Sequence, residues 1–134
     1  MKESLKIAAI QFDIKWESKH ENLQIIEKSL EKFSETDIIL LPEMFTTGFT
    51  MQAKKFSENM GGKTIKWMKK WSKKLDLAIA GSIIISEGSE IYNRFVFVTP
   101  ESQIFFYDKR HTFTLANENK YYTKGNNLGI FDYQ

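Results

Sequence analysis

Apolar positions in the first 45 residues change from a continuous run to helical spacing and back. Residues 5–12 (LKIAAIQF) form a mostly apolar run, which predicts a buried strand. A helix is predicted over about 18–33, because Ser18 and Glu21 have the spacing of a capping box and large apolar residues follow every three or four positions: Leu23, Ile26, Leu30 and Phe33. The β-branched run 37–41 predicts a second strand, so this region indicates a βαβ unit with a right-handed crossover.

The second half of the chain begins with a strongly amphipathic pattern. Residues 63–75 predict a helix in which six Lys surround an apolar side made of Ile65, Met68, Trp71 and Leu75. A buried strand is predicted over 77–85, where Gly81 indicates a close backbone approach.

The remaining residues predict strands and loops. Runs at 91–99 and 104–107 flank a turn at 100–102, which is typical of an antiparallel pair. A long loop is expected over 111–127 and a further strand over 128–133. The change from a βαβ unit to antiparallel strands predicts the α/β class with a mixed sheet.

Composition narrows the class of protein. The 134 residues suffice for one domain, and 42% hydrophobic with 27% charged residues are typical of a globular chain. A net charge of +2 gives no argument for nucleic acid, and no apolar run reaches the roughly 18 residues of a membrane span. With no Cys and two distant His, neither a metal nor a cofactor is expected. We therefore expect a cytoplasmic protein without nucleic-acid or membrane partners.

Two of the predicted strands end in a charged side chain. Glu43 follows the apolar run 37–41, and Lys109 follows the aromatic run 104–107. Because open α/β sheets place reactive groups at the carboxyl ends of their strands, such a carboxylate and ammonium can perform acid/base chemistry. Either residue alone is more often a solvated loop carboxylate or a charge that terminates an edge strand.

With these motifs the chain resembles the nitrilase superfamily of carbon–nitrogen hydrolases, in its omega-amidase-like branch. The resemblance runs from Leu5 to about Phe131, and its segments are AAIQF at 8–12, LLPEMF at 40–45, YDKRH at 107–111, and Asn117-Glu118 followed by Tyr121 and Gly125. It implies a four-layer α-β-β-α sandwich, of which the predicted elements fit the N-terminal half. It also implies a homodimer that hydrolyses a small linear amide, an omega-amide of a 2-oxo acid.

The resemblance assigns catalytic roles to three residues. Glu43 would be the general base and then the general acid, and Lys109 would stabilise the tetrahedral intermediate. Glu118 matches a second glutamate that positions the lysine and the substrate. Carboxylates on both sides of the ammonium would keep the Lys charged.

The nucleophile that the resemblance implies is a Cys after the next strand, and the sequence contains none. We therefore expect residues 1–134 to be a carbon–nitrogen hydrolase domain cut short on its C-terminal side. Such a chain alone is expected to be inactive.

Two other interpretations remain open at this point. One is a catalytically inactive nitrilase-like binding module. The other is an interaction protein that uses the helix 63–75, where Trp67 and Trp71 beside the Lys residues would form a stacking platform or a membrane-surface helix.

Overall fold

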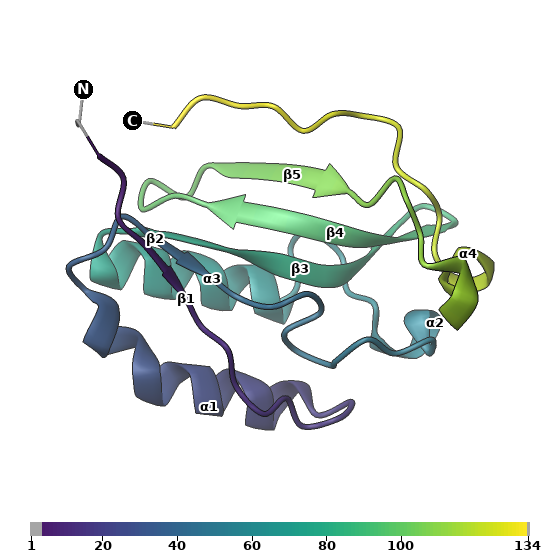
Figure 1. Cartoon of the computed structure of the whole chain (residues 1–134), viewed down its shortest axis with the longest axis horizontal. Helices are drawn as coiled ribbons and strands as arrows, with labels where there is room; N and C mark the ends of the chain where they lie inside the picture. The colour runs from purple at the N-terminus through teal and green to yellow at the C-terminus, as the bar shows by residue number, and fades with distance from the viewer. Residues whose placement is uncertain (1–3, 134) are drawn as a thin grey trace.

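A five-stranded mixed sheet organises the chain in the computed structural model, which describes residues 4–133 (Figure 1). The strands lie in sequence order: β1 (Ile7–Ala9), β2 (Ile38–Leu40), β3 (Ala78–Glu87), β4 (Glu90–Val98) and β5 (Ile104–Asp108). β1, β2 and β3 are parallel, whereas β3, β4 and β5 pair antiparallel. The predicted mixed α/β sheet is therefore confirmed, and β2, β3 and β5 all run in the same direction.

Two helices cover one face of this sheet (Figure 1). α1 (Lys19–Leu30) continues into the short 3-10 helix η1 (Glu31–Phe33), and α3 (Lys63–Leu75) has the predicted bounds. Large aliphatic side chains from both helices and from the sheet form the main core: Ile26, Leu30, Ile39, Ile65, Met68, Ile79, Ile83, Ile85, Val96 and Val98. The helical spacing seen in the sequence thus marks the sides of the helices that face the sheet.

The start of each long helix differs from expectation. Ser18 is the N-cap of α1, but its hydroxyl donates to Glu21 Oε1 at 3.0 Å and makes no capping hydrogen bond, so the predicted capping box is wrong. α3 follows Gly62, which has no side chain to cap it. Glu58, in the loop before the helix, caps it instead, accepting hydrogen bonds from Thr64 N at 2.7 Å and Thr64 Oγ1 at 2.9 Å.

The indoles of α3 point into the protein. Trp67 and Trp71 are each 8% exposed, and both indole N–H groups donate to Glu27 Oε1 of α1, at 2.7 and 3.2 Å. The alternative interpretation of the helix 63–75 as an exposed stacking platform is therefore wrong, because the rings pack α3 against α1 and the sheet. None of the helices within residues 4–133 is long and apolar enough to cross a membrane.

The opposite face of the sheet is covered by the last described residues, which run back along β5 (Figure 1). Phe131 stacks on Phe105 with centroids 4.4 Å apart, and Tyr133 meets Phe97 edge-on at 4.9 Å. The strand predicted over 128–133 is wrong, because this segment lies over a sheet face, where it packs rings and pairs with no strand in the described part of the chain. Gly129, at φ +66°, also interrupts its extended conformation.

Two further expectations change in detail, and one short helix was not expected. The run 5–12 contributes only β1, and this strand is the sheet edge, with Ile7 52% exposed, because nothing pairs beyond it among the described residues. The loop expected over 111–127 contains two short helices, η2 (Thr114–Ala116) and α4 (Glu118–Tyr121), and α2 (Ala53–Phe56) precedes α3. Each is only about one turn long, which is too short to give a periodic signal.

Candidate active site

The three predicted site residues meet at one end of the sheet. Lys109 Nζ lies 2.8 Å from Glu43 Oε1 and 3.1 Å from Glu118 Oε2. β2 and β5 run in the same direction, so the loops that follow them emerge at the same end of the sheet. The predicted convergence is confirmed, although 66 residues separate Glu43 from Lys109.

The loop that carries Glu43 is tied to β3. Met44 adopts a left-handed conformation, with φ 48°, and its N–H donates to Ser82 Oγ at 2.8 Å. Gly81 leaves room for this loop, because a Cβ there would lie 2.8 Å from Phe45 Cδ1. The backbone approach predicted at Gly81 is therefore wrong in kind, because the groups that come close are the side chains of Phe45 and Leu41.

Lys109 and Glu118 are held more tightly than Glu43. Lys109 N donates to the carbonyl of Asn93 at 3.0 Å, which extends the β4–β5 pairing by one residue. Glu118 begins α4 and is fully buried, with Phe113 N donating to its Oε2 at 2.5 Å. A buried carboxylate requires such donors, because an unpaired charge inside a protein is costly.

Asn93 is a site residue that sequence reasoning missed. It is 2% exposed, and its Nδ2 donates to Glu43 Oε1 at 2.7 Å and to Glu118 Oε1 at 3.1 Å. A signal did exist, since Asn is disfavoured within strands and Asn93 interrupts the otherwise apolar or aromatic positions of its face, Phe95 and Phe97.

The electrostatics keep Lys109 protonated. Partial burial of its ammonium works against the charge, but hydrogen bonds to Glu43 and Glu118 outweigh burial and raise the pKa of Lys109 above its ordinary value. The ring of Phe49 adds a cation–π contact, with its centroid 5.1 Å from Nζ. The site therefore presents a permanent cation beside one accessible carboxylate and one buried carboxylate.

Tyr122 lies next to this charged group. Burial raises the pKa of Tyr122, and the charges of Glu118 and Glu43 raise it further. Its hydroxyl donates to the carbonyl of Thr50 at 2.6 Å. The phenol is thus a neutral support for the loop 44–52 and takes no negative charge near the site.

A pocket of about 430 Å³ opens at these residues. Its lining combines the charged groups with apolar and aromatic walls: Leu41, Glu43, Ser82, Asn93, Phe95, Tyr107 and Lys109. A carboxylate and an ammonium on one wall of such a pocket can move a proton and stabilise a developing oxyanion.

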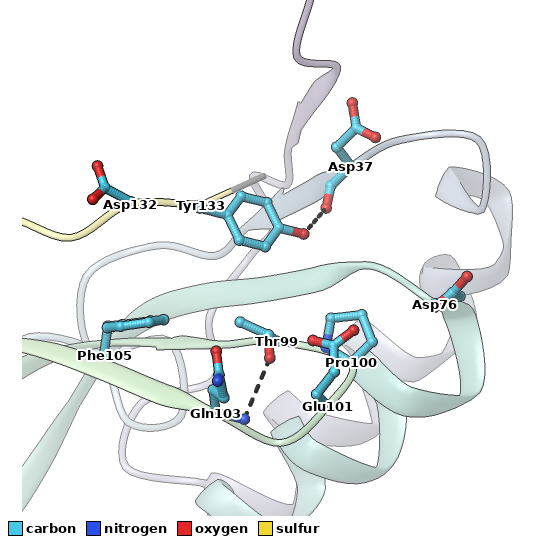
Figure 2. A pocket seen from close by; sticks show the side chains of 9 residues that line it. All are labelled: Asp37, Asp76, Thr99, Pro100, Glu101, Gln103, Phe105, Asp132 and Tyr133. Carbon is cyan, nitrogen blue, oxygen red and sulfur yellow. Dashed lines mark hydrogen bonds between the residues drawn. The ribbon is translucent and has the colours of Figure 1, made fainter. Parts of the chain in front are cut away.

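A second pocket, of about 320 Å³, lies at the other end of the sheet, where β5 begins and β4 ends (Figure 2). Its charged lining residues are all acidic: Asp37, Asp76, Glu101 and Asp132. Tyr133 closes one side and donates a long hydrogen bond of 3.5 Å to the carbonyl of Asp37. Within residues 4–133, no three His, Asp or Glu side chains are grouped to hold a metal ion.

Two relatives resemble this chain over nearly its whole length. Omega-amidase YafV of Yersinia enterocolitica is 36% identical over 133 residues, which cover 98% of this chain and 51% of that protein. The 2-oxoglutaramate amidase of Bacillus subtilis is 34% identical over 130 residues, which cover 94% of this chain and 50% of that protein. The chain therefore spans about half the length of these relatives.

Solved structures show the same fold. A CN-hydrolase superfamily protein from Xanthomonas campestris, with an arsenic adduct in its active site, superposes with a TM-score of 0.88 at 32% identity, covering 92% of this chain and 47% of that one. Nit3 of Saccharomyces cerevisiae, a member of branch 10 of the nitrilase superfamily, has a TM-score of 0.77 at 21% identity, covering 92% and 49%. Because residues 6–134 also match the sequence profile of the carbon-nitrogen hydrolases, the chain belongs to the carbon-nitrogen hydrolase family.

Proposed function

We propose that this chain supplies the acid/base and lysine residues of an amidase that converts a small linear amide into a carboxylate and ammonia. The observation that carries the proposal is the contact of Lys109 with Glu43, at 2.8 Å, beside a pocket of about 430 Å³. The substrate class we propose is an omega-amide of a 2-oxo acid, which agrees with the names of two relatives, an omega-amidase and a 2-oxoglutaramate amidase.

In the proposed mechanism Glu43 moves the protons. It accepts the proton of a Cys thiol, and the thiolate attacks the amide carbonyl carbon to form a tetrahedral oxyanion. The protonated Glu43 then gives its proton to the amide nitrogen, and the carbon–nitrogen bond breaks. Ammonia departs, and the acyl group stays on the Cys as a thioester. A water molecule, deprotonated by Glu43, attacks the thioester, so the carboxylate is released and the thiol regains its proton.

Lys109 and Glu118 have fixed roles in this proposal. The ammonium of Lys109 donates a hydrogen bond to each tetrahedral oxyanion, and its raised pKa keeps it charged throughout. Glu118 holds Lys109 from the buried side and takes no proton. We propose that the Cys lies in residues outside this sequence and that the 134 residues form the N-terminal half of a carbon–nitrogen hydrolase domain. We further propose that the intact enzyme is a cytoplasmic homodimer.

The test uses the full-length protein, which includes the residues after Gln134. Ammonia release from 2-oxoglutaramate is measured for the wild type, Glu43→Gln and Lys109→Met. We expect each substitution to lower kcat by about two orders of magnitude or more, because each removes a group needed in the transition state.

Matched exposed positions provide the controls. Glu35→Gln and Lys120→Met make the same chemical changes on the surface and should retain wild-type kcat. A wild-type protein that releases no ammonia from 2-oxoglutaramate or from simple aliphatic amides would overturn the proposed reaction. Wild-type turnover by Glu43→Gln would remove that residue from the mechanism.

A further inference from the structure

We propose that Asn93 is a positioning residue, which fixes the two glutamates around Lys109 and selects Oε2 of Glu43 as the oxygen that carries the proton. This inference rests on the proposed function. Asn93 contacts the reacting groups only through the residues that it holds.

One side chain and its own backbone reach all three members of the site. The two N–H bonds of the Asn93 amide point to Glu43 Oε1 and to Glu118 Oε1, at 2.7 and 3.1 Å. The carbonyl of Asn93 accepts the N–H of Lys109 at 3.0 Å. Asn93 on β4 therefore fixes the positions of residues from three separate segments relative to one another.

The position on β4 is itself rigid. Asn93 pairs with Ile84 in the middle of the sheet, and its side chain is 2% exposed. Water therefore cannot easily replace the amide as a donor to the glutamates. Because both amide protons are used, loss of this side chain leaves two carboxylate oxygens without that partner.

The hydrogen bonds distinguish the two oxygens of Glu43. Oε1 accepts both from Lys109, at 2.8 Å, and from Asn93, at 2.7 Å. Oε2 accepts no hydrogen bond from any residue among 4–133, and the Glu43 side chain is 49% exposed at the pocket. A proton on Oε1 would face two N–H donors at close range. The oxygen that can take a proton and pass it to a substrate is therefore Oε2.

The charged surroundings set how a substitution at Asn93 will behave. Glu43 reaches Asn93 from the loop after β2, Lys109 from the end of β5, and Glu118 from α4. Tyr122, at the end of α4, contributes a neutral phenol. A carboxylic acid at position 93 can replace one amide N–H while it is protonated, and it becomes a third carboxylate once it ionises.

The experiment compares Asn93→Ala and Asn93→Asp in the full-length enzyme, with kcat and KM measured across pH. Asn93→Ala should lower kcat by about 10- to 100-fold with little change in KM, because a misplaced catalytic group slows the chemical step. At acidic pH the kcat of Asn93→Asp should exceed that of Asn93→Ala, because the protonated carboxyl group at position 93 donates a hydrogen bond. The kcat of Asn93→Asp divided by that of Asn93→Ala should fall as the pH rises. Titrations that affect both variants equally cancel in this ratio.

Asn22 offers a matched control. It is also fully buried, and its Nδ2 donates to the carbonyls of Lys15 and Thr46 at 2.8 Å each, but it contacts none of the site residues. Asn22→Asp and Asn22→Ala should lower the melting temperature, whereas the ratio of their kcat values should not depend on pH.

Three results would overturn the inference. One is a kcat ratio at position 93 that is as flat with pH as the ratio at position 22, and another is a loss confined to KM. The third is a crystal structure of Asn93→Ala in which Glu43 keeps its orientation toward Lys109. If Asn93→Ala does not fold, the kcat of Asn93→Asp is compared with that of the wild type instead. A ratio of these two kcat values that does not fall as the pH rises would then overturn the inference. A wild type without amidase activity would instead count against the proposed function.

Discussion

Arg94 and Asp108 form a two-pronged ion pair directly across β4 and β5, with Arg94 Nε 2.6 Å from Asp108 Oδ1 and Nη2 2.9 Å from Oδ2. The pair lies on the face of β4 opposite to Asn93, and Asp108 directly precedes Lys109 in the sequence. The Arg94 side chain is 3% exposed and that of Asp108 is 15% exposed, so both charges are largely removed from water. Arg94 also reaches Glu87 at 2.8 Å.

We expect Arg94→Met to lower the free energy of unfolding of the full-length protein by about 3–5 kcal/mol, because it leaves Asp108 buried without its partner. Denaturant unfolding measures the loss. Adding Asp108→Leu should recover part of it, since the double variant has no unpaired charge. The exposed pair Lys74–Glu31 is the control, and Glu31→Gln should leave the free energy of unfolding nearly unchanged, because water screens this pair. A similar loss at both pairs would contradict this account.

Gly81→Ala is expected to disturb the loop that carries Glu43. The added Cβ would lie 2.8 Å from Phe45 Cδ1 and 2.9 Å from Leu41 Cβ, and overpacking of this kind typically costs about 1–3 kcal/mol. The melting temperature and kcat should both fall, and adding Phe45→Leu to Gly81→Ala should restore part of each. Gly61→Ala, whose Cβ would meet only the Asn59 side chain at 3.3 Å, should have a smaller effect on both.

Tyr122 is expected to make the protein less stable at alkaline pH. Burial, with the nearby charges of Glu118 and Glu43, raises the pKa of Tyr122 above its ordinary value of 10.0. The folded state therefore holds this proton more tightly than the unfolded chain, so its contribution is complete below pH 10.0 and is lost as the pH rises further. Denaturant midpoints should fall more steeply with pH for the wild type than for Tyr122→Phe. The exposed Tyr121→Phe should follow the wild type, and equal slopes in all three would refute the prediction.

The 134-residue chain made alone is expected to self-associate. Apolar side chains remain exposed at the edge strand and along the terminal segment, with Ile7 at 52%, Leu128 at 69% and Ile130 at 85%. Sedimentation or light scattering should detect species larger than a monomer. Under the proposed function, a second chain that carries the C-terminal half of the carbon–nitrogen hydrolase domain should suppress them and give amide hydrolysis. A soluble monomer with one sharp unfolding transition would contradict this expectation.

Sequence patterns predicted the elements that bury one regular face. The spacing of Ile65, Met68 and Trp71 gave the bounds of α3, and the run 77–85 matches β3 (Ala78–Glu87) except for Leu77 at its start and the last two residues of the strand. The patterns failed where side-chain contacts between elements decide the structure. Glu58 caps α3 with its side chain from the loop before the helix, and the segment 128–133 packs its rings over a sheet face and pairs with no strand among residues 4–133.

The same distinction applies to the candidate site. Glu43, Lys109 and Glu118 were predicted because each belongs to a short motif with a known chemical use. Asn93 has no such motif, and its meaning comes from two hydrogen bonds to residues 50 and 25 positions away. The roles of Glu43 and Lys109 in catalysis, and of Glu118 and Asn93 in positioning them, are predictions that the kinetic experiments test.

The strand order also determines when this site can form during folding. Glu43 follows β2 and Lys109 follows β5, so their contact requires β3 and β4 to have paired between them. Contacts between residues so distant in sequence form slowly, whereas helices such as α1 and α3 depend on local contacts and form early. The turn that joins β4 to β5, closed by Thr99 N donating to the carbonyl of Gln103 at 3.0 Å, lies at the far end of the sheet from the ammonium. Changes in that turn should therefore delay the appearance of activity during refolding and leave its final level unaltered.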